Sequence, residues 1–134
     1  MKGLIALLGE PDATVAVVGA SHDPSKFGNI IYRDLRRKGF TVFAINPNRT
    51  HVADDKAFGS LKELPDTPTI VDFVVPPAVG AKVLRECLDL GLMNVWLQPG
   101  AESRENLVFL QEHGFNYIAD DCIMVHTRLA TPHS

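Results

Sequence analysis

The 134-residue sequence has little of what defines several large protein classes. Its two cysteines, Cys87 and Cys122, lack C-x-x-C spacing, which argues against a disulfide framework and against a structural zinc site. No apolar run approaches the roughly 18 residues of a membrane span. The segment 2–9 is too short for a signal peptide and has no A-x-A cleavage pattern. We therefore expect a cytoplasmic protein that does not contact a membrane.

The charge balance and the histidines exclude further classes. Thirteen Lys and Arg against 16 Asp and Glu give a formal net charge of -3, which argues against nucleic acid as a partner. The five histidines show neither metal-ligand spacing nor a Ser/His/Asp order, so we expect no metal and assign no catalytic residue. With 46% hydrophobic residues, the chain can form one core. We expect one domain over 1–134, with a frayed tail at 131–134.

What the sequence does contain is an alternation of β-branched runs and helical segments, the pattern of βαβ units. The predicted strands are Thr14–Val18, Thr41–Ile45, Ile70–Val75, Asn94–Leu97 and Asn116–Ala119. Apolar residues at helical spacing fall between them, and the predicted stripes are Phe27, Ile31 and Leu35, then Val79, Val83, Cys87 and Leu90, then Leu107 and Leu110. This predicts an α/β fold, a Rossmann-like doubly wound sheet of about five parallel strands between two helical layers.

Glycine and proline mark the helix ends. The pairs Gly39-Phe40, Gly91-Leu92 and Gly114-Phe115 each precede a predicted strand, as expected where a left-handed glycine ends a helix. Pro76-Pro77 is typical of a helix start. In 46–69 we expect only a one-turn helix near Ser60–Leu64 and a short edge strand. An apolar helix is expected within Met1–Asp12, where Leu4, Ile5, Leu7 and Leu8 would cover the sheet or a second subunit.

In an open parallel sheet, ligands bind outside the carboxyl ends of the strands. After the first strand comes a loop of small residues, from Gly19 to Asn29, that would let backbone N–H groups and a helix N-terminus face an anion such as a pyrophosphate. Only Gly19 fits the G-x-G-x-x-G fingerprint, so an ordinary strand-to-helix turn remains an alternative.

The residue after the second strand discriminates between nucleotides. Asn46-Pro47-Asn48-Arg49 stands where an NAD site would need an acidic residue for the ribose 2′-hydroxyl. A cation at Arg49 instead suits a phosphorylated ribose, which occurs in NADP and in coenzyme A. A solvated loop cation is the alternative interpretation of Arg49.

Five motifs together resemble the small stand-alone CoA-binding domain proteins, which are similar to the N-terminal domain of the succinyl-CoA synthetase alpha subunit. The motifs are Gly19-Ala20-Ser21, Asn46-Pro47-Asn48, Val75-Pro76-Pro77, Trp96-Leu97-Gln98-Pro99-Gly100 and Asp121-Cys122-Ile123-Met124. The match extends from about Thr14 to about Leu129. The resemblance implies that the ligand is coenzyme A, or an acyl-CoA.

The resemblance also implies which residues contact the ligand. The pyrophosphate positions are Gly19, Ala20, Ser21, Ser25 and Lys26; the nucleotide positions are Asn46, Pro47, Asn48 and Arg49; and the remaining contacts are Val75, Pro76, Pro77, Leu97, Gln98, Pro99 and Gly100. Where the synthetase has a Glu-Gly pair, this chain has Pro99-Gly100, so no carboxylate is available there.

Catalysis does not carry over with the resemblance, because the synthetase's phosphorylated histidine lies in a second domain that has no counterpart in this sequence. We expect a non-catalytic binding module, with a regulatory or thiol-protective role. Cys122 follows the last strand, where its thiol would pair with the CoA thiol, although a buried inert cysteine is the alternative. An NADP-dependent oxidoreductase and a CoA-using transferase acting with a partner are competing hypotheses. A homodimer and an unknown protein partner both stay open.

Overall fold

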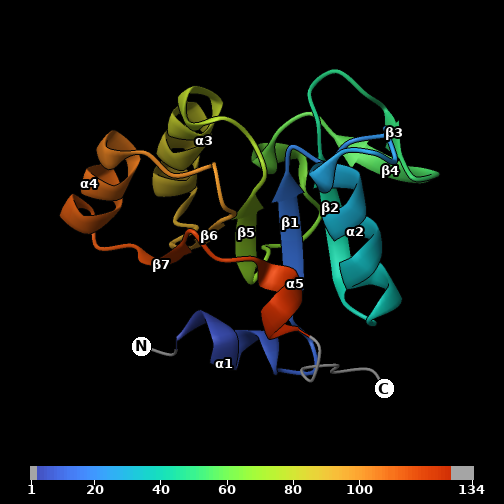
Figure 1. Cartoon of the computed structure of the whole chain (residues 1–134), viewed down its shortest axis with the longest axis horizontal. Coiled ribbons are helices and arrows are strands. Elements are labelled where there is room, and N and C mark those ends of the chain that lie inside the picture. The colour runs from blue at the N-terminus through green and yellow to red at the C-terminus, as the bar shows by residue number, and fades with distance from the viewer. Residues whose placement is uncertain (1–2, 128–134) are drawn as a thin grey trace.

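All five predicted strands are present in the computed structural model, which describes residues 3–127 (Figure 1). They are β1 (Thr14–Val18), β2 (Thr41–Ile45), β5 (Ile70–Phe73), β6 (Asn94–Leu97) and β7 (Asn116–Ala119). β5 ends two residues before the predicted boundary. In the segment where one edge strand was predicted, β3 (His51–Val52) and β4 (Asp55–Phe58) form a hairpin instead.

The strands form one sheet in the order β3-β4-β2-β1-β5-β6-β7. Every neighbouring pair is parallel except β3 and β4. After β1 the chain moves outward to β2, and it later returns to β5 on the other side of β1. This reversal makes the carboxyl ends of β1 and β5 a topological switch point. The predicted Rossmann-like doubly wound fold is confirmed, with seven strands where about five were expected.

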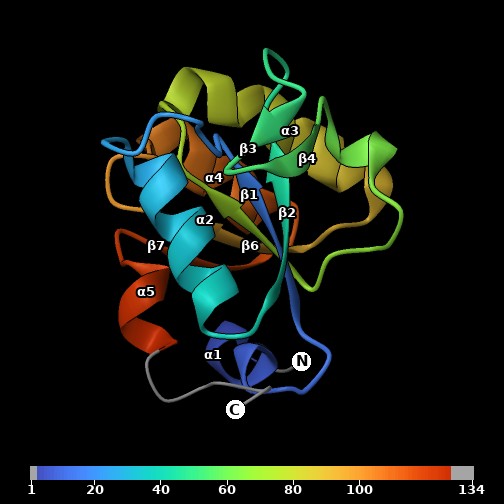
Figure 2. The ribbon, with the colours of Figure 1, turned by 90° about the vertical axis from the view of Figure 1, so that its right-hand side faces the viewer.

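Helices cover both faces of the sheet (Figure 2). One core lies under α1 (Leu4–Leu8), α2 (Phe27–Arg37) and α5 (Ile123–His126), and a second core lies under η1 (Leu61–Glu63), α3 (Pro77–Leu90) and α4 (Arg104–Glu112). Leu4 and Leu8 pack into the first core, so the apolar N-terminal helix does cover the sheet. Residues 1–2 and the predicted tail at 131–134 lie outside the described residues.

Three helices end as their glycines predict. Gly39, Gly91 and Gly114 have φ values of 99°, 74° and 70°. The N–H of the apolar residue after each glycine donates to a carbonyl five residues back, from Phe40 to Leu35 for example, and this is the Schellman pattern. The buried Phe40, Leu92 and Phe115 then lead the chain into the next strand.

Two predicted helix stripes are partly wrong. Phe27 is 65% exposed, because it occupies the first position of α2, at the carboxyl ends of the central strands. Val79 and Leu90 are also exposed, whereas Gly80, Leu84 and Cys87 are the buried residues of α3. The buried stripe of α3 is therefore rotated from the predicted one, with Gly80 facing the Phe73 side chain of β5. No helix among residues 3–127 is both long and apolar enough to cross a membrane.

Candidate ligand site at the carboxyl edge of the sheet

Two glycines hold the loop after β1 close to its neighbours. Gly19 has φ 94°, and a Cβ at this position would lie 2.4 Å from the carbonyl oxygen of Val74. A Cβ on Gly28, in the first turn of α2, would lie only 2.0 Å from the carbonyl oxygen of Gly19. Gly28 thus performs the close-packing role of the last glycine in dinucleotide-binding loops, at a longer spacing. The N-terminus of α2 is consequently fixed directly behind the loop.

The start of α2 has the electrostatics of an anion site. Its N-cap, Lys26, makes no side-chain cap, and no acidic residue stands in the first turn. Among residues 3–127, the N–H groups of Ala20, Ser21, His22, Phe27 and Gly28 have no hydrogen-bond acceptor. Free N–H groups at a helix N-terminus attract negative charge, and phosphate is a common ligand at such sites.

The loop itself is held by short side chains. The hydroxyl of Ser21 accepts a bond from Asp23 N (3.0 Å), and the Asp23 carboxylate accepts bonds from Ser25 N (2.9 Å) and Ser25 Oγ (2.8 Å). These two donors from Ser25 lower the pKa of Asp23. Ser25, a predicted phosphate contact, therefore has both of its donors engaged, and a ligand would have to displace Asp23 to use them.

A polar hollow of about 560 Å³ lies on one side of this loop, towards the β3–β4 hairpin. Arg49 lines it, together with His22, Asn29 and Arg33. Asn46 ties this side to the first loop, because its Nδ2 donates to Ala20 O (2.9 Å) while its Oδ1 accepts a bond from Asn48 N (2.8 Å).

An apolar hollow of about 390 Å³ lies on the other side of the loop, over the ends of β5 and β6. Its predicted members are Val75, Pro76, Pro77, Gln98, Pro99, Gly100 and Cys122. Gln98 is 4% exposed, and its Oε1 accepts a bond from Ile123 N (3.0 Å). Among residues 3–127, its Nε2 has no hydrogen-bond acceptor, which leaves the two N–H donors of this amide free at the wall of the hollow.

The family of the chain is evident over almost its whole length. Residues 13–128 match the model of the CoA binding domain family. The chain belongs to the CoA-binding domain family.

Relatives of this family member are of two kinds. It is 26% identical over 127 residues to an ADP-forming acetate–CoA ligase I of Archaeoglobus fulgidus and 28% identical over 120 residues to the alpha subunit of such a ligase II in Pyrococcus furiosus. These alignments cover 87% and 81% of this chain but only 18% and 26% of the ligases. A conserved hypothetical protein from Pyrococcus furiosus has a similar structure (TM-score 0.81, 45% identity), with 84% of this chain and 97% of that chain covered.

In this CoA-binding domain most of the predicted contact residues lie at the carboxyl edge of the sheet, but their side chains differ in exposure. Gly19, Ala20, Ser21, Ser25 and Lys26 form the loop between the two hollows, and Pro47 and Asn48 are exposed beyond Asn46. Leu97 is different, since its side chain is 1% exposed and packs in the core under α3 and α4. The structure therefore does not bring the Leu97 side chain to the hollow.

Several lining residues were missed from the sequence. Phe27, assigned to a buried stripe, lines the apolar hollow with Ile31 and Val74. Asn29 and Arg33 line the polar hollow from α2. Asn29 and Arg33 are four residues apart and so lie on one side of a helix. The orientation of that side against the loop depends on the close contact of Gly28 with Gly19, which no local pattern indicates.

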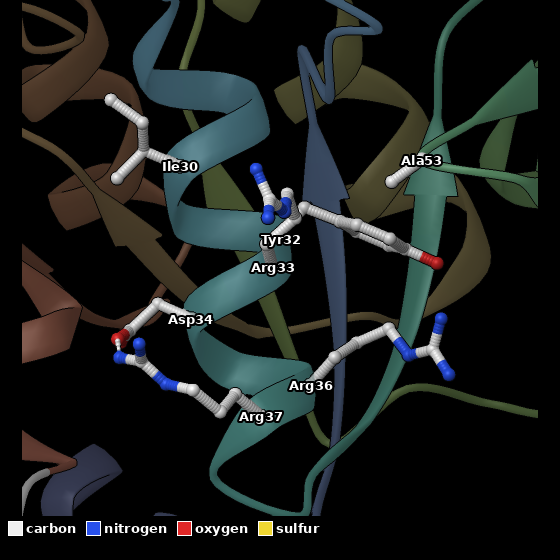
Figure 3. A pocket seen from close by; sticks show the side chains of 7 residues that line it. All are labelled: Ile30, Tyr32, Arg33, Asp34, Arg36, Arg37 and Ala53. Carbon is white, nitrogen blue, oxygen red and sulfur yellow. Dashed lines mark hydrogen bonds and ion pairs between the residues drawn. The ribbon is translucent and has the colours of Figure 1, made fainter. Parts of the chain in front are cut away.

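The remaining cations of α2 are engaged elsewhere. Figure 3 shows a third hollow, between α2 and the hairpin, with Arg33, Arg36 and Arg37 at its wall. Arg36 pairs with Asp55, which also accepts a bond from Tyr32 Oη (2.8 Å), and Arg37 pairs with Asp34 (2.5 Å). The contacts of Arg36 and Tyr32 with Asp55 join α2 to the hairpin, whereas Arg37 pairs within α2; Arg33 takes part in neither.

Proposed function

We propose that this CoA-binding domain protein binds coenzyme A or an acyl-CoA, without catalysis, at the carboxyl edge of its sheet. The observation that carries the proposal is the order of three environments along that edge. An uncapped helix N-terminus with free N–H groups stands between a hollow that contains arginines and a hollow that is apolar.

The three environments match the chemistry of coenzyme A from end to end. A phosphorylated ribose suits the arginines, a pyrophosphate suits the N-terminus of α2, and a pantetheine arm suits the wall formed by Pro76, Pro77 and Pro99. In this pose the ligand thiol would lie in the hollow that Cys122 lines. Withdrawal of the thiol from solvent in this pose supports a thiol-protective or regulatory role as part of the proposal.

Family relationship supports the ligand but not the ligase reaction. The acetate–CoA ligases are named for an activity of proteins several times longer than this chain. The residues on the described edge offer donors, cations and apolar walls, and we assign none of them a catalytic role. A non-catalytic role is therefore the simplest function for the edge.

Thermal unfolding with added nucleotides tests the proposal. Coenzyme A should raise the melting temperature more than NADP or NAD does, by the equivalent of about 2.7 kcal/mol at one hundred times its Kd. Equal or greater protection by NADP would favour the oxidoreductase hypothesis. Protection by none of the three would overturn the proposed function.

A further inference from the structure

A second arginine faces the ribose end of the proposed CoA site. Arg33 and Arg49 come from different elements, α2 and the loop after β2, yet they line the same polar hollow. Both side chains are exposed. Within residues 3–127, neither guanidinium has a hydrogen-bonded or ion-paired partner.

Arg33 differs from the cations that follow it on α2, because those cations are ion-paired. Arg36, Arg37 and Lys38 all pair with carboxylates, on Asp55 or Asp34. In Figure 3 the Arg33 side chain points upward, in the direction of the β1 arrowhead. The Arg36 and Arg37 side chains lie lower in the same view. The only unpaired cation of the described α2 helix is therefore directed towards the ligand edge.

A third residue in the same hollow offers a buried acceptor. Asn29 is 3% exposed, and its Nδ2 donates to Ser21 O (2.9 Å). Its Oδ1 is buried and has no partner in the described part of the chain. Folded proteins rarely leave a buried polar atom unpaired, so this oxygen favours a ligand that brings a donor. A ribose hydroxyl beside the phosphate would supply one.

The hollow also contains carboxylates, which limits what the arginines can hold. Asp23 and Asp54 line it together with Arg33 and Arg49, so the four formal charges cancel. The Asp23 carboxylate accepts hydrogen bonds from Ser25, however, while neither guanidinium pairs with a carboxylate in the described part of the chain. An incoming dianion can bond to both arginines through their N–H groups, and an uncharged hydroxyl gains much less.

We propose that Arg33 and Arg49 together hold the phosphate on the ribose of the ligand and that Arg33 is a specificity-determining residue for that phosphate. The inference rests on the proposed function, since it names the residues that would distinguish coenzyme A from its analogue without the 3′-phosphate. Neither residue acts on the thiol end of the ligand, which lies across the first loop.

Titration calorimetry with coenzyme A and with dephospho-CoA tests the inference. Wild-type protein should prefer coenzyme A, and Arg33→Ala or Arg49→Ala should each weaken coenzyme A about tenfold while changing dephospho-CoA by less than about twofold. The double variant should bind the two ligands equally. Arg37→Ala is the matched control on the same helix and should change neither affinity.

The outcomes separate this inference from the proposal on which it rests. A wild-type protein that binds coenzyme A and dephospho-CoA equally would overturn the two-arginine assignment and leave CoA binding intact. The same holds for an Arg33→Ala variant with unchanged preference. If wild-type protein binds neither ligand, both proposals are wrong. Circular dichroism of each variant verifies folding, which these exposed substitutions should preserve.

Discussion

At the scale of single residues, the two cysteines occupy opposite environments. Cys87 is fully buried in α3, and burial raises the pKa of its thiol to about 12. Cys122 is partly exposed, lines the apolar hollow and precedes α5. The thiolate is the reactive form of cysteine, so only Cys122 should be able to exchange with a bound disulfide.

This difference gives a prediction about oxidised coenzyme A. The Cys122 thiolate should attack the CoA disulfide, form a protein–CoA disulfide and release one CoA thiolate. Intact-mass spectrometry should then show one added CoA on wild-type protein and on Cys87→Ser. The Cys122→Ser variant should stay unmodified, and labelling of that variant would remove Cys122 from the ligand's thiol end.

A second residue-scale feature is the buried carboxyl group of Asp72. It lies in β5 between Val17 of β1 and Trp96 of β6, is 0% exposed, and neither oxygen has a partner in the described residues. Burial alone raises its pKa well above the usual value. The folded protein therefore holds this proton more tightly than the unfolded chain does.

Stability should accordingly fall as pH rises above the unfolded pKa of about 3.9, by up to about 1.4 kcal/mol per pH unit until the folded pKa is reached. Asp72→Asn should flatten this dependence, and Asp72→Val should flatten it and raise the melting temperature at neutral pH. Melting curves between pH 4 and pH 8 measure both effects. A pH dependence that is identical in wild type and Asp72→Asn would show that another group is responsible.

At the scale of elements, the position of α2 depends on Gly28. Replacement by alanine would place a methyl group 2.0 Å from the backbone carbonyl of Gly19, and neither backbone can rotate away as a flexible side chain would. Gly28→Ala should cost about 1–3 kcal/mol of unfolding free energy and should weaken coenzyme A, because the helix N-terminus moves from the loop.

Gly3→Ala is the control for this substitution, since no atom of residues 3–127 outside its immediate neighbours lies within 4 Å of a Cβ there and its φ of -65° suits any residue. Chemical denaturation measures the loss of stability, and calorimetry measures the loss of affinity. If Gly28→Ala binds coenzyme A as wild type does, the N-terminus of α2 is not part of the site.

The same elements show why sequence reasoning succeeded in some places and failed in others. Central strands and glycine-ended helices were predictable, because hydrophobic runs and positive-φ glycines are local signals. The β3–β4 hairpin was not, because its turn uses Ala53 (φ 48°) and Asp54 (φ 67°) where Asn-Gly would have been recognised. The exposure of Phe27 and the place of Arg33 depend on how α2 docks, which no local pattern encodes.

At the scale of the whole molecule, a formal net charge of -3 must be reconciled with a highly anionic ligand. The cations of α2 beyond Arg33 are neutralised by Asp34 and Asp55. Within residues 3–127, Arg33, Arg49 and Lys26 form no ion pair, and with the N-terminus of α2 they can turn towards a ligand at the carboxyl edge, although Asp23 and Asp54 line the same hollow. A local field of this kind attracts phosphates even when the total charge is negative.

This division of charge predicts how salt affects binding. The screening length between exposed charges is about 10 Å at 0.1 M ionic strength and becomes shorter as salt is added. The affinity for coenzyme A should therefore fall steadily as the salt concentration is raised. Pantetheine has no phosphate and would occupy only the apolar hollow, so its weaker binding should be nearly independent of salt. Dephospho-CoA should show an intermediate slope, because it keeps the pyrophosphate. Calorimetry over a salt series measures all three slopes, and a common slope would mean that the phosphates are not held by the cations of this edge.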